Sequence, residues 1–226
     1  MAGAALMRPA DTLPYRKITD RLLKWWRKNK REFPWRCTSD PYRVIVAAVL
    51  LRRTNAYKVN LIYTDFFRKY PDIASLARAE VSELTDFLKP LGLYNIRARE
   101  LKEIAAQILR KYGGRVPADP NELMKIKGVG RYIASAVACF AYGKPVPVVD
   151  AVVARVISRV AGLKNEHGSI SPIVWSIAEE FVKCGSAVEI NLALMDLAAL
   201  ICLPKNPRCS KCPVREFCKS AIMQHK

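Results

Sequence analysis

The sequence predicts an all-helical protein, and three observations lead to this prediction. Apolar residues recur at helical spacing along most of the 226 residues, which favours amphipathic helices packed on a common core. The strict alternation of apolar and polar residues that is typical of strands is nearly absent. Proline and glycine stand between the periodic segments, where helices are expected to begin and end.

The first half of the chain contains the clearest helical segments. Ile18, Leu22 and Trp26 place an apolar stripe on a first helix. The Asp-Pro pair at 40–41 is typical of a helix start, because aspartate caps the first turn and proline fits its first position. The helices expected after that pair cover residues 42–51, 55–70, 74–77, 81–88 and 96–112.

The second half continues the helical pattern around two turns that contain glycine. The glycine pair at 113–114 is typical of a helix C-terminus. The Gly-Val-Gly segment at 128–130 separates two further helices, and Pro172 is expected in the first turn of another. The helices expected in this half cover residues 121–126, 131–142, 151–160, 173–183 and 190–201.

Composition indicates a basic protein with a core of its own. Lysine and arginine total 38 against 20 acidic residues, a net charge of +18, and 51% of residues are hydrophobic. A folded surface of this charge favours a polyanion such as nucleic acid. No apolar run approaches the roughly 18 residues of a membrane span, and residues 1–14 carry too short an apolar patch for a signal peptide. We therefore expect a cytoplasmic protein without a membrane partner, associated with the nucleoid in a prokaryote.

Four cysteines near the end of the chain form the most specific motif. They follow the spacing C-x6-C-x2-C-x5-C, at Cys202, Cys209, Cys212 and Cys218. Four cysteines this close together, in a chain without an evident secretory signal, indicate a metal site. A zinc ribbon usually shows two separated C-x2-C pairs, whereas a single irregular loop suits a [4Fe–4S] cluster in which each iron takes one thiolate.

A second motif is a glycine hairpin between two short helices, over residues 123–132. Gly128 and Gly130 permit positive φ and close approach of another backbone. The N–H groups at the start of the following helix can bind a phosphate oxygen. Lys127 and Arg131 add positive charge beside it, so the segment is a candidate contact with a nucleic-acid backbone.

Asp150 is a candidate functional carboxylate. It follows the apolar segment 145–149 and precedes the helix expected over 151–160. An aspartate at this place is typical of a helix N-cap. The same carboxylate in a basic chain is also a candidate for catalysis, and both interpretations stay open.

The hairpin, the Val149-Asp150 pair and the cysteine motif together resemble the helix-hairpin-helix DNA glycosylases that carry an iron–sulfur cluster, the endonuclease III and MutY superfamily. The resemblance extends from about residue 35 to residue 218. It implies a six-helix lobe over 37–145, with the helix-hairpin-helix at about 121–142. It also implies a discontinuous lobe of 1–36 plus 146–226 that holds the [4Fe–4S] cluster.

Tyr132 indicates a branch of this superfamily. It stands where endonuclease III-like enzymes carry a catalytic lysine and MutY usually has serine. The tyrosine, with Leu-Leu-Arg-Arg-Thr at 50–54, resembles the archaeal MIG-type glycosylases, which remove thymine or uracil opposite guanine. MutY proteins normally have glutamine at the positions of Arg52 and Arg53. The resemblance implies a monofunctional glycosylase without lyase activity, acting as a monomer on mismatched double-stranded DNA.

The resemblance also implies roles for individual residues. Asp150 would stabilise positive charge on the sugar, and Tyr132 would line the base pocket. Arg53 is the first candidate, and Leu93 the second, for the side chain that fills the gap left by a flipped base. The DNA contacts that we expect are at Arg52, Arg53, Leu93, Lys127, Gly128, Gly130 and Arg131.

Two positions depart from the pattern of these relatives. Ala48 stands where MutY and MIG-like proteins usually have glutamate, and Val152 stands where they usually have asparagine. Both changes remove polar groups near the expected active site. The alternatives left open are a non-catalytic or inactivated mismatch-binding variant, a MutY-like adenine glycosylase, a bifunctional lyase and an electron carrier. Alanine cannot protonate a purine, so Ala48 disfavours adenine excision.

Overall fold

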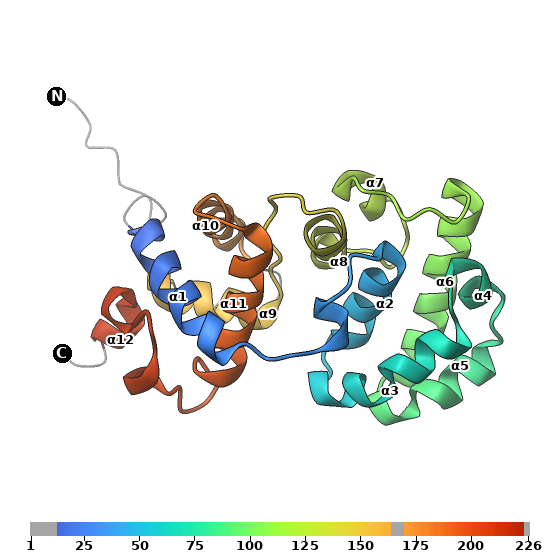
Figure 1. Cartoon of the computed structure of the whole chain (residues 1–226), viewed down its shortest axis with the longest axis horizontal. Helices are drawn as coiled ribbons and strands as arrows, with labels where there is room; N and C mark the ends of the chain where they lie inside the picture. Colours follow the sequence, from blue (N-terminus) through green and yellow to red (C-terminus); the bar gives the residue numbers. More distant parts are fainter. Residues whose placement is uncertain (1–12, 164–169, 224–226) are drawn as a thin grey trace. The chain divides into compact units, whose positions relative to one another are not determined.

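The structure is a computed structural model that describes residues 13–163 and 170–223. Every regular element within these residues is a helix (Figure 1), so the prediction of an all-helical protein is confirmed. The chain divides into two compact units, Met1–Arg31 with Pro145–Lys226, and Glu32–Lys144. The lobe predicted over 1–36 plus 146–226 includes residues 1–12, which lie outside the described residues. None of the described helices is long and apolar enough to cross a membrane.

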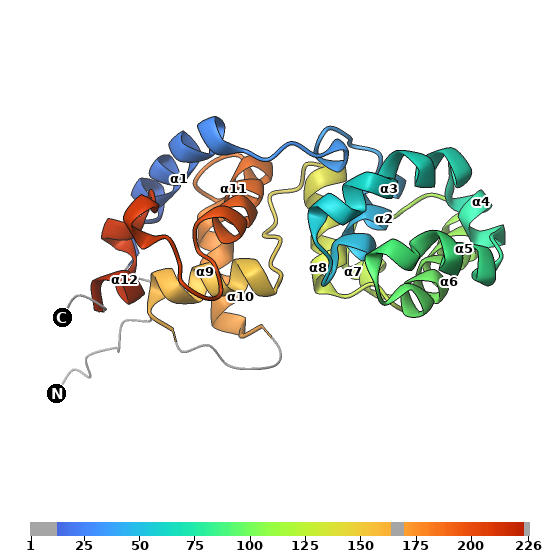
Figure 2. The same cartoon turned by 90° about the horizontal axis from the view of Figure 1, so that it is seen from below.

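The discontinuous unit combines one N-terminal helix with the C-terminal part of the chain. Its helix α11 packs against α1 and α9, and the short α12 also packs on α9 (Figure 2). The helices are α1 (Tyr15–Asn29), α9 (Ala151–Ala161), α10 (Pro172–Val182), α11 (Ala187–Leu200) and α12 (Lys219–Met223). Leu22, Ile190 and Phe181 are buried in its core.

Asp196 joins the two chain segments of this unit. Its carboxylate is fully buried on α11. It accepts hydrogen bonds from Trp26 Nε1 at 2.9 Å, from the Arg31 backbone N at 3.1 Å and from Arg31 Nε at 2.6 Å. A buried carboxylate needs such partners to offset its lost hydration. The N-terminal segment is therefore fixed to α11 by polar bonds as well as by apolar packing.

The continuous unit is built around α6, a helix of 19 residues. α4 and α5 pack along α6 (Figure 1), and α2 packs against α3, α6 and α8. Eight of the eleven residues of α2 are buried, as its apolar sequence predicts. The helices are α2 (Pro41–Leu51), α3 (Ala56–Lys69), α4 (Ile73–Arg78), α5 (Val81–Leu88), α6 (Tyr94–Tyr112), α7 (Pro120–Met124) and α8 (Arg131–Ala136).

Capping side chains explain four of the seven helix starts in this unit. Asp40 accepts a hydrogen bond from Tyr42 N at 2.9 Å, and Asn55 accepts one from Tyr57 N at 2.8 Å. Several boundaries differ from those expected by one or two residues, and two of the differences reflect an uncommon backbone conformation. α6 begins at Tyr94 rather than at residue 96, because Leu93 turns the chain through a left-handed conformation. The helix expected over 131–142 is α-helical to Ala136 and then continues as a π-helix, Val137–Ala141.

Candidate functional site

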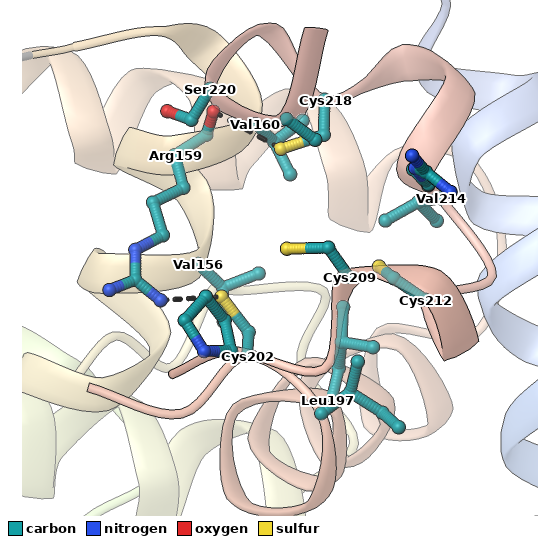
Figure 3. Close-up of a pocket in the computed structure, with 14 residues that line it drawn as sticks. Val156, Arg159, Val160, Leu197, Cys202, Cys209, Cys212, Val214, Cys218 and Ser220 are labelled. Carbon is teal, nitrogen blue, oxygen red and sulfur yellow. Dashed lines mark hydrogen bonds between the residues drawn. The ribbon is translucent and has the colours of Figure 1, made fainter. Parts of the chain in front are cut away.

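The four cysteines of the C-terminal motif surround one cavity of about 190 Å³ in the discontinuous unit. Figure 3 shows their sulfur atoms around the central hollow, with Val156 and Leu197 contributing apolar lining from α9 and α11. The loop that carries the cysteines contains one-turn helices at Cys209–Lys211 and Arg215–Phe217. The residues predicted to ligate a cluster are thus brought together.

Two arginines of α9 hold the start of this cysteine loop. Arg155 Nε donates to Cys202 O at 3.0 Å. Arg159 donates to Leu203 O at 2.6 Å and Pro204 O at 2.9 Å, and its Nη1 lies 3.4 Å from Cys202 Sγ (Figure 3). Sequence reasoning missed both arginines. The sequence did contain a signal for them, because two arginines four residues apart lie on one side of a mostly apolar helix.

This donor set fits a [4Fe–4S] cluster. The four sulfurs line one cavity, and four thiolates are the ligands that such a cluster takes. Burial raises the pKa of Cys212 to about 11 and also raises the pKa of Cys218. Bound iron would offset that effect, because a nearby cation favours the thiolate. When bound, the cluster would supply four iron–thiolate bonds that hold the loop in shape.

Asp150 caps the first turn of α9. Its Oδ1 accepts hydrogen bonds from Val152 N at 3.0 Å and Val153 N at 2.8 Å. Burial raises the pKa of the carboxyl, and these two N–H groups oppose that rise. The N-cap interpretation is therefore correct as local structure, and it leaves Oδ2 outside both bonds.

The apolar segment 145–149, which precedes Asp150, is held by a buried amide on α11. Asn191 Oδ1 accepts from Val148 N at 2.8 Å, and Asn191 Nδ2 donates to Val146 O at 3.0 Å. Val148 and Val149 are fully buried. Sequence reasoning missed Asn191, whose signal was a single amide within the apolar segment 187–200. Together with the cap, this amide sets where the Asp150 carboxylate lies.

The two altered positions lie in different units. Val152 follows Asp150 in the first turn of α9, with 37% of its surface exposed. Ala48 is 4% exposed, in the buried helix α2 of the continuous unit. A methyl group at residue 48 offers no proton donor, and an isopropyl group at residue 152 offers no hydrogen bond.

The glycine hairpin has the form that the sequence predicts, with one difference. Gly128 has φ of +96°, and a Cβ there would lie 3.3 Å from Glu100 Cγ and 3.4 Å from Ile104 Cδ1. Gly130 has φ of −86° and open space around it, so it is an ordinary N-cap of α8 rather than a second left-handed turn. Arg131 is exposed, and Tyr132 is half-buried.

Gln107 of α6 holds the backbone of the hairpin through two hydrogen bonds. Its Oε1 accepts from Lys127 N at 3.0 Å, and its Nε2 donates to Lys127 O at 3.3 Å. The Lys127 side chain itself is exposed. Gln107 is another buried polar residue that sequence reasoning missed, because its partner lies 20 residues away.

The predicted gap-filling residues share an uncommon backbone conformation. Arg53 has φ of +54° and Leu93 has φ of +51°, values that non-glycine residues seldom adopt. Both are exposed, Leu93 to 51%. Arg52, also predicted to contact DNA, forms a two-point ion pair with Glu100 at 2.8 and 3.0 Å.

Comparison with known proteins agrees with these features. The thymine/uracil-DNA glycosylase of Methanothermobacter thermautotrophicus is 40% identical over 87% of this chain and 90% of its own length. The human adenine DNA glycosylase is 35% identical, but the match covers only 38% of that protein. A solved structure of a thermostable thymine-DNA glycosylase superimposes with a TM-score of 0.86, at 39% identity, over 92% of this chain and 97% of that chain.

Family models account for both motifs. Residues 202–218 match the iron–sulfur binding domain of endonuclease III, which agrees with the cysteine-lined cavity. Residues 46–178, more than half of the chain, match the model described as HhH-GPD superfamily base excision DNA repair protein. This match includes the hairpin and Asp150. The chain therefore belongs to the HhH-GPD superfamily of base excision DNA repair proteins.

Proposed function

We propose that this protein is a monofunctional DNA glycosylase that hydrolyses the N-glycosidic bond of thymine or uracil mispaired with guanine. The observation that carries the chemistry is Asp150, a half-buried carboxylate anchored by backbone N–H groups at the first turn of α9. The substrate class is supported by the thymine/uracil-DNA glycosylase of M. thermautotrophicus, which matches this chain over 87% of its length.

In this proposal Asp150 acts on the sugar. Cleavage of the glycosidic bond builds positive charge on the ring, as in glycoside hydrolysis. A carboxylate below the ring stabilises that charge and can accept a proton from the attacking water. Because Oδ1 already accepts two backbone hydrogen bonds, we assign the contact with the sugar and the water to Oδ2.

The remaining predicted residues would bind the duplex and the flipped base. Arg53 and Leu93 would fill the gap in the base stack, and Tyr132 would line the pocket. The hairpin would contact the phosphate backbone. Exposed cations of the cysteine loop would add further phosphate contacts, at Lys205, Arg208, Lys211 and Arg215. The two compact units would correspond to the two predicted lobes, in a monomer associated with the nucleoid of a prokaryote.

Residue 132 supports hydrolysis without strand cleavage. Schiff-base chemistry needs a free amine close to the sugar, and the tyrosine there has none. Lys125, near the hairpin, donates to Glu122 Oε1 at 2.6 Å. Borohydride is therefore expected to trap no covalent adduct between the protein and DNA, and a trapped adduct would overturn the monofunctional assignment.

The deciding experiment is single-turnover excision on labelled duplexes that contain T:G, U:G, A:G or T:A. We expect strand breaks at T:G and U:G only after alkali treatment. Nicking without alkali would indicate a lyase, and release of adenine from A:G would indicate a MutY-like activity. Mismatch binding without release of any base would contradict the proposal and favour a mismatch sensor.

The sensor is the second candidate because Val152 removes a polar group beside Asp150. Val152→Asn tests it directly, since the exposed side chain can be exchanged without disturbing the core. In an active enzyme we expect this variant to raise the single-turnover rate at T:G by about tenfold, equivalent to about 1.4 kcal/mol. If the natural protein releases no base and Val152→Asn does, the natural protein is a mismatch sensor.

A further inference from the structure

One buried guanidinium connects the two exposed loops that carry Arg53 and Leu93. Arg97 lies in the first turn of α6 and is only 3% exposed. Its Nη1 donates to Leu91 O at 3.0 Å and to Gly92 O at 2.6 Å. Its Nη2 donates to Arg52 O and to Thr54 Oγ1. The same side chain therefore bonds both loops, which are about 40 residues apart in sequence.

Two of the carbonyls that Arg97 bonds directly precede the left-handed residues. Arg52 O belongs to the peptide bond between Arg52 and Arg53, and Gly92 O belongs to the peptide bond between Gly92 and Leu93. Arg53 and Leu93 are two of the non-glycine residues with positive φ among those described. Such a conformation is unfavourable unless surrounding groups hold it. Arg97 thus fixes the peptide plane immediately before each left-handed residue.

Arginine suits this position for reasons of geometry. Its guanidinium presents five N–H donors in a rigid plane, so it can bond several carbonyls at once, whereas lysine offers a single ammonium centre. Burial lowers the pKa of Arg97, and the nearby Arg52 lowers it further while Glu100 opposes that effect. Taking a cation out of water costs free energy unless hydrogen-bond acceptors surround it. The loop carbonyls compensate that cost.

The same side of α6 also reaches the glycine hairpin. Glu100 pairs with Arg52, and its Cγ lies beside Gly128. Gln107, two further turns along, bonds the Lys127 backbone in both directions. Residues 97, 100 and 107 are spaced to share one helix face. One rigid helix therefore supports all three segments of this unit that are predicted to contact DNA.

We propose that Arg97 is a positioning residue, which presets the two gap-filling residues Arg53 and Leu93 in a fixed mutual arrangement before DNA binds. The inference rests on the proposed function, because it assigns these side chains to the space left by a flipped base. Presetting lowers the conformational cost of insertion. Loss of Arg97 should therefore impair insertion at a mismatch while leaving phosphate contacts to any duplex in place.

The test uses the full chain with its cluster, in two backgrounds. In an Asp150→Asn background, the fluorescence of 2-aminopurine next to the mismatch reports unstacking without requiring base release. In the natural background, single-turnover excision at T:G reports chemistry. We expect Arg97→Met to lower the unstacking amplitude and to slow excision by on the order of tenfold to a hundredfold. We expect it to change affinity for a matched duplex by less than about twofold, and Arg97→Lys to restore part of the loss.

Two further variants separate positioning from general damage. Thr54→Val removes one acceptor of Arg97 at a half-buried site, and we expect the same defect in weaker form. Gln107→Leu removes a buried polar group from the same helix face but releases only the hairpin. Gln107→Leu should lower the affinity for matched and mismatched duplexes alike. If Arg97→Met fails to fold, as judged by circular dichroism, Thr54→Val decides the question.

The outcomes distinguish this inference from the proposed function. A folded Arg97→Met protein with natural unstacking and natural excision would overturn the positioning role. An equal loss of affinity for matched and mismatched duplexes would also overturn it, since that pattern indicates general destabilisation. A natural chain that unstacks the mismatch but releases no base would contradict the glycosylase activity alone.

Discussion

At the residue scale, Asp150 combines two roles on one carboxylate. Oδ1 satisfies two N–H groups at the start of α9, and Oδ2 is the atom that we assign to catalysis. Asparagine caps a helix about as well as aspartate does, but it carries no charge to stabilise the sugar. The two roles can therefore be separated by one substitution.

Asp150→Asn is expected to fold normally and to keep its affinity for a T:G duplex. Its single-turnover excision rate should fall by roughly a hundredfold to ten-thousandfold, because it lacks the general base and the anionic charge. Gel-shift titration and quenched excision measure the two quantities on one preparation. Turnover close to that of the natural protein would remove Asp150 from the mechanism.

The pH dependence of excision follows from the same carboxyl. Burial raises its folded-state pKa above the ordinary 3.8. Excision needs the ionised form, so the rate should rise with pH through that raised pKa and reach a plateau above it.

The contribution of the Asp150 carboxyl to the free energy of unfolding changes with pH in the opposite direction. The folded protein holds this proton more tightly, so the free energy of unfolding falls as pH rises from the unfolded to the folded pKa. Excision rates measured between acid and neutral pH should show the rise, and Asp150→Asn should lack it.

At the element scale, α9 joins two parts of the discontinuous unit. It begins at the Asp150 cap, and Arg155 and Arg159 on its later turns hold the carbonyls that start the cysteine loop. The loop has no strand partner among the described residues to fix its backbone. Its turns are closed by local backbone hydrogen bonds such as Arg208 N to Ile201 O at 2.9 Å. The two arginines fix where the loop starts, and the four thiolate bonds to a cluster would hold its turns together.

Arg159→Gln should loosen the cysteine loop. Two carbonyl bonds from a charged donor are lost, and we expect a destabilisation of about 2–4 kcal/mol. The visible absorbance of the cluster should disappear at a lower temperature than in the natural protein. Arg208→Gln is the matched control, since this exposed arginine makes one long bond of 3.4 Å to Leu200 O. Equal cluster loss in both variants would argue against a specific role of Arg159.

The helices were predictable from the sequence because their causes are local. Apolar spacing, the Asp40 cap and the glycine pair at 113–114 lie within the segments that they define. The cysteine spacing likewise predicted one shared site for the four cysteines, and the structure places them around one cavity. The partners of Arg97, Gln107 and Asn191 were not predictable, because each side chain bonds backbone groups 20 or more residues away in at least one contact. A carbonyl acceptor carries no side-chain signature, so neither partner marks the pair in the sequence.

At the scale of the whole molecule, the net charge of +18 should make DNA binding depend strongly on salt. Each phosphate contact contributes a slope of about −0.9 to the dependence of log affinity on log salt concentration. Four contacts would lower affinity for a matched duplex by about a hundredfold between roughly 50 and 200 mM salt. Fluorescence anisotropy across that range measures the slope. A flat profile would mean that the basic surface does not bind the phosphate backbone.

The bonds from Trp26 and Arg31 to Asp196 have a consequence for synthesis on the ribosome. The segment 32–144 emerges as one uninterrupted stretch and can fold while translation continues. Arg31 can bond Asp196 only after 165 further residues have been synthesised. At roughly 5–20 residues per second this takes on the order of ten seconds or more. During that delay the apolar face of α1 has no partner on α11. The unit that holds the cysteines therefore matures after the segment 32–144, and iron can be retained by all four cysteines only after Cys218 has been made.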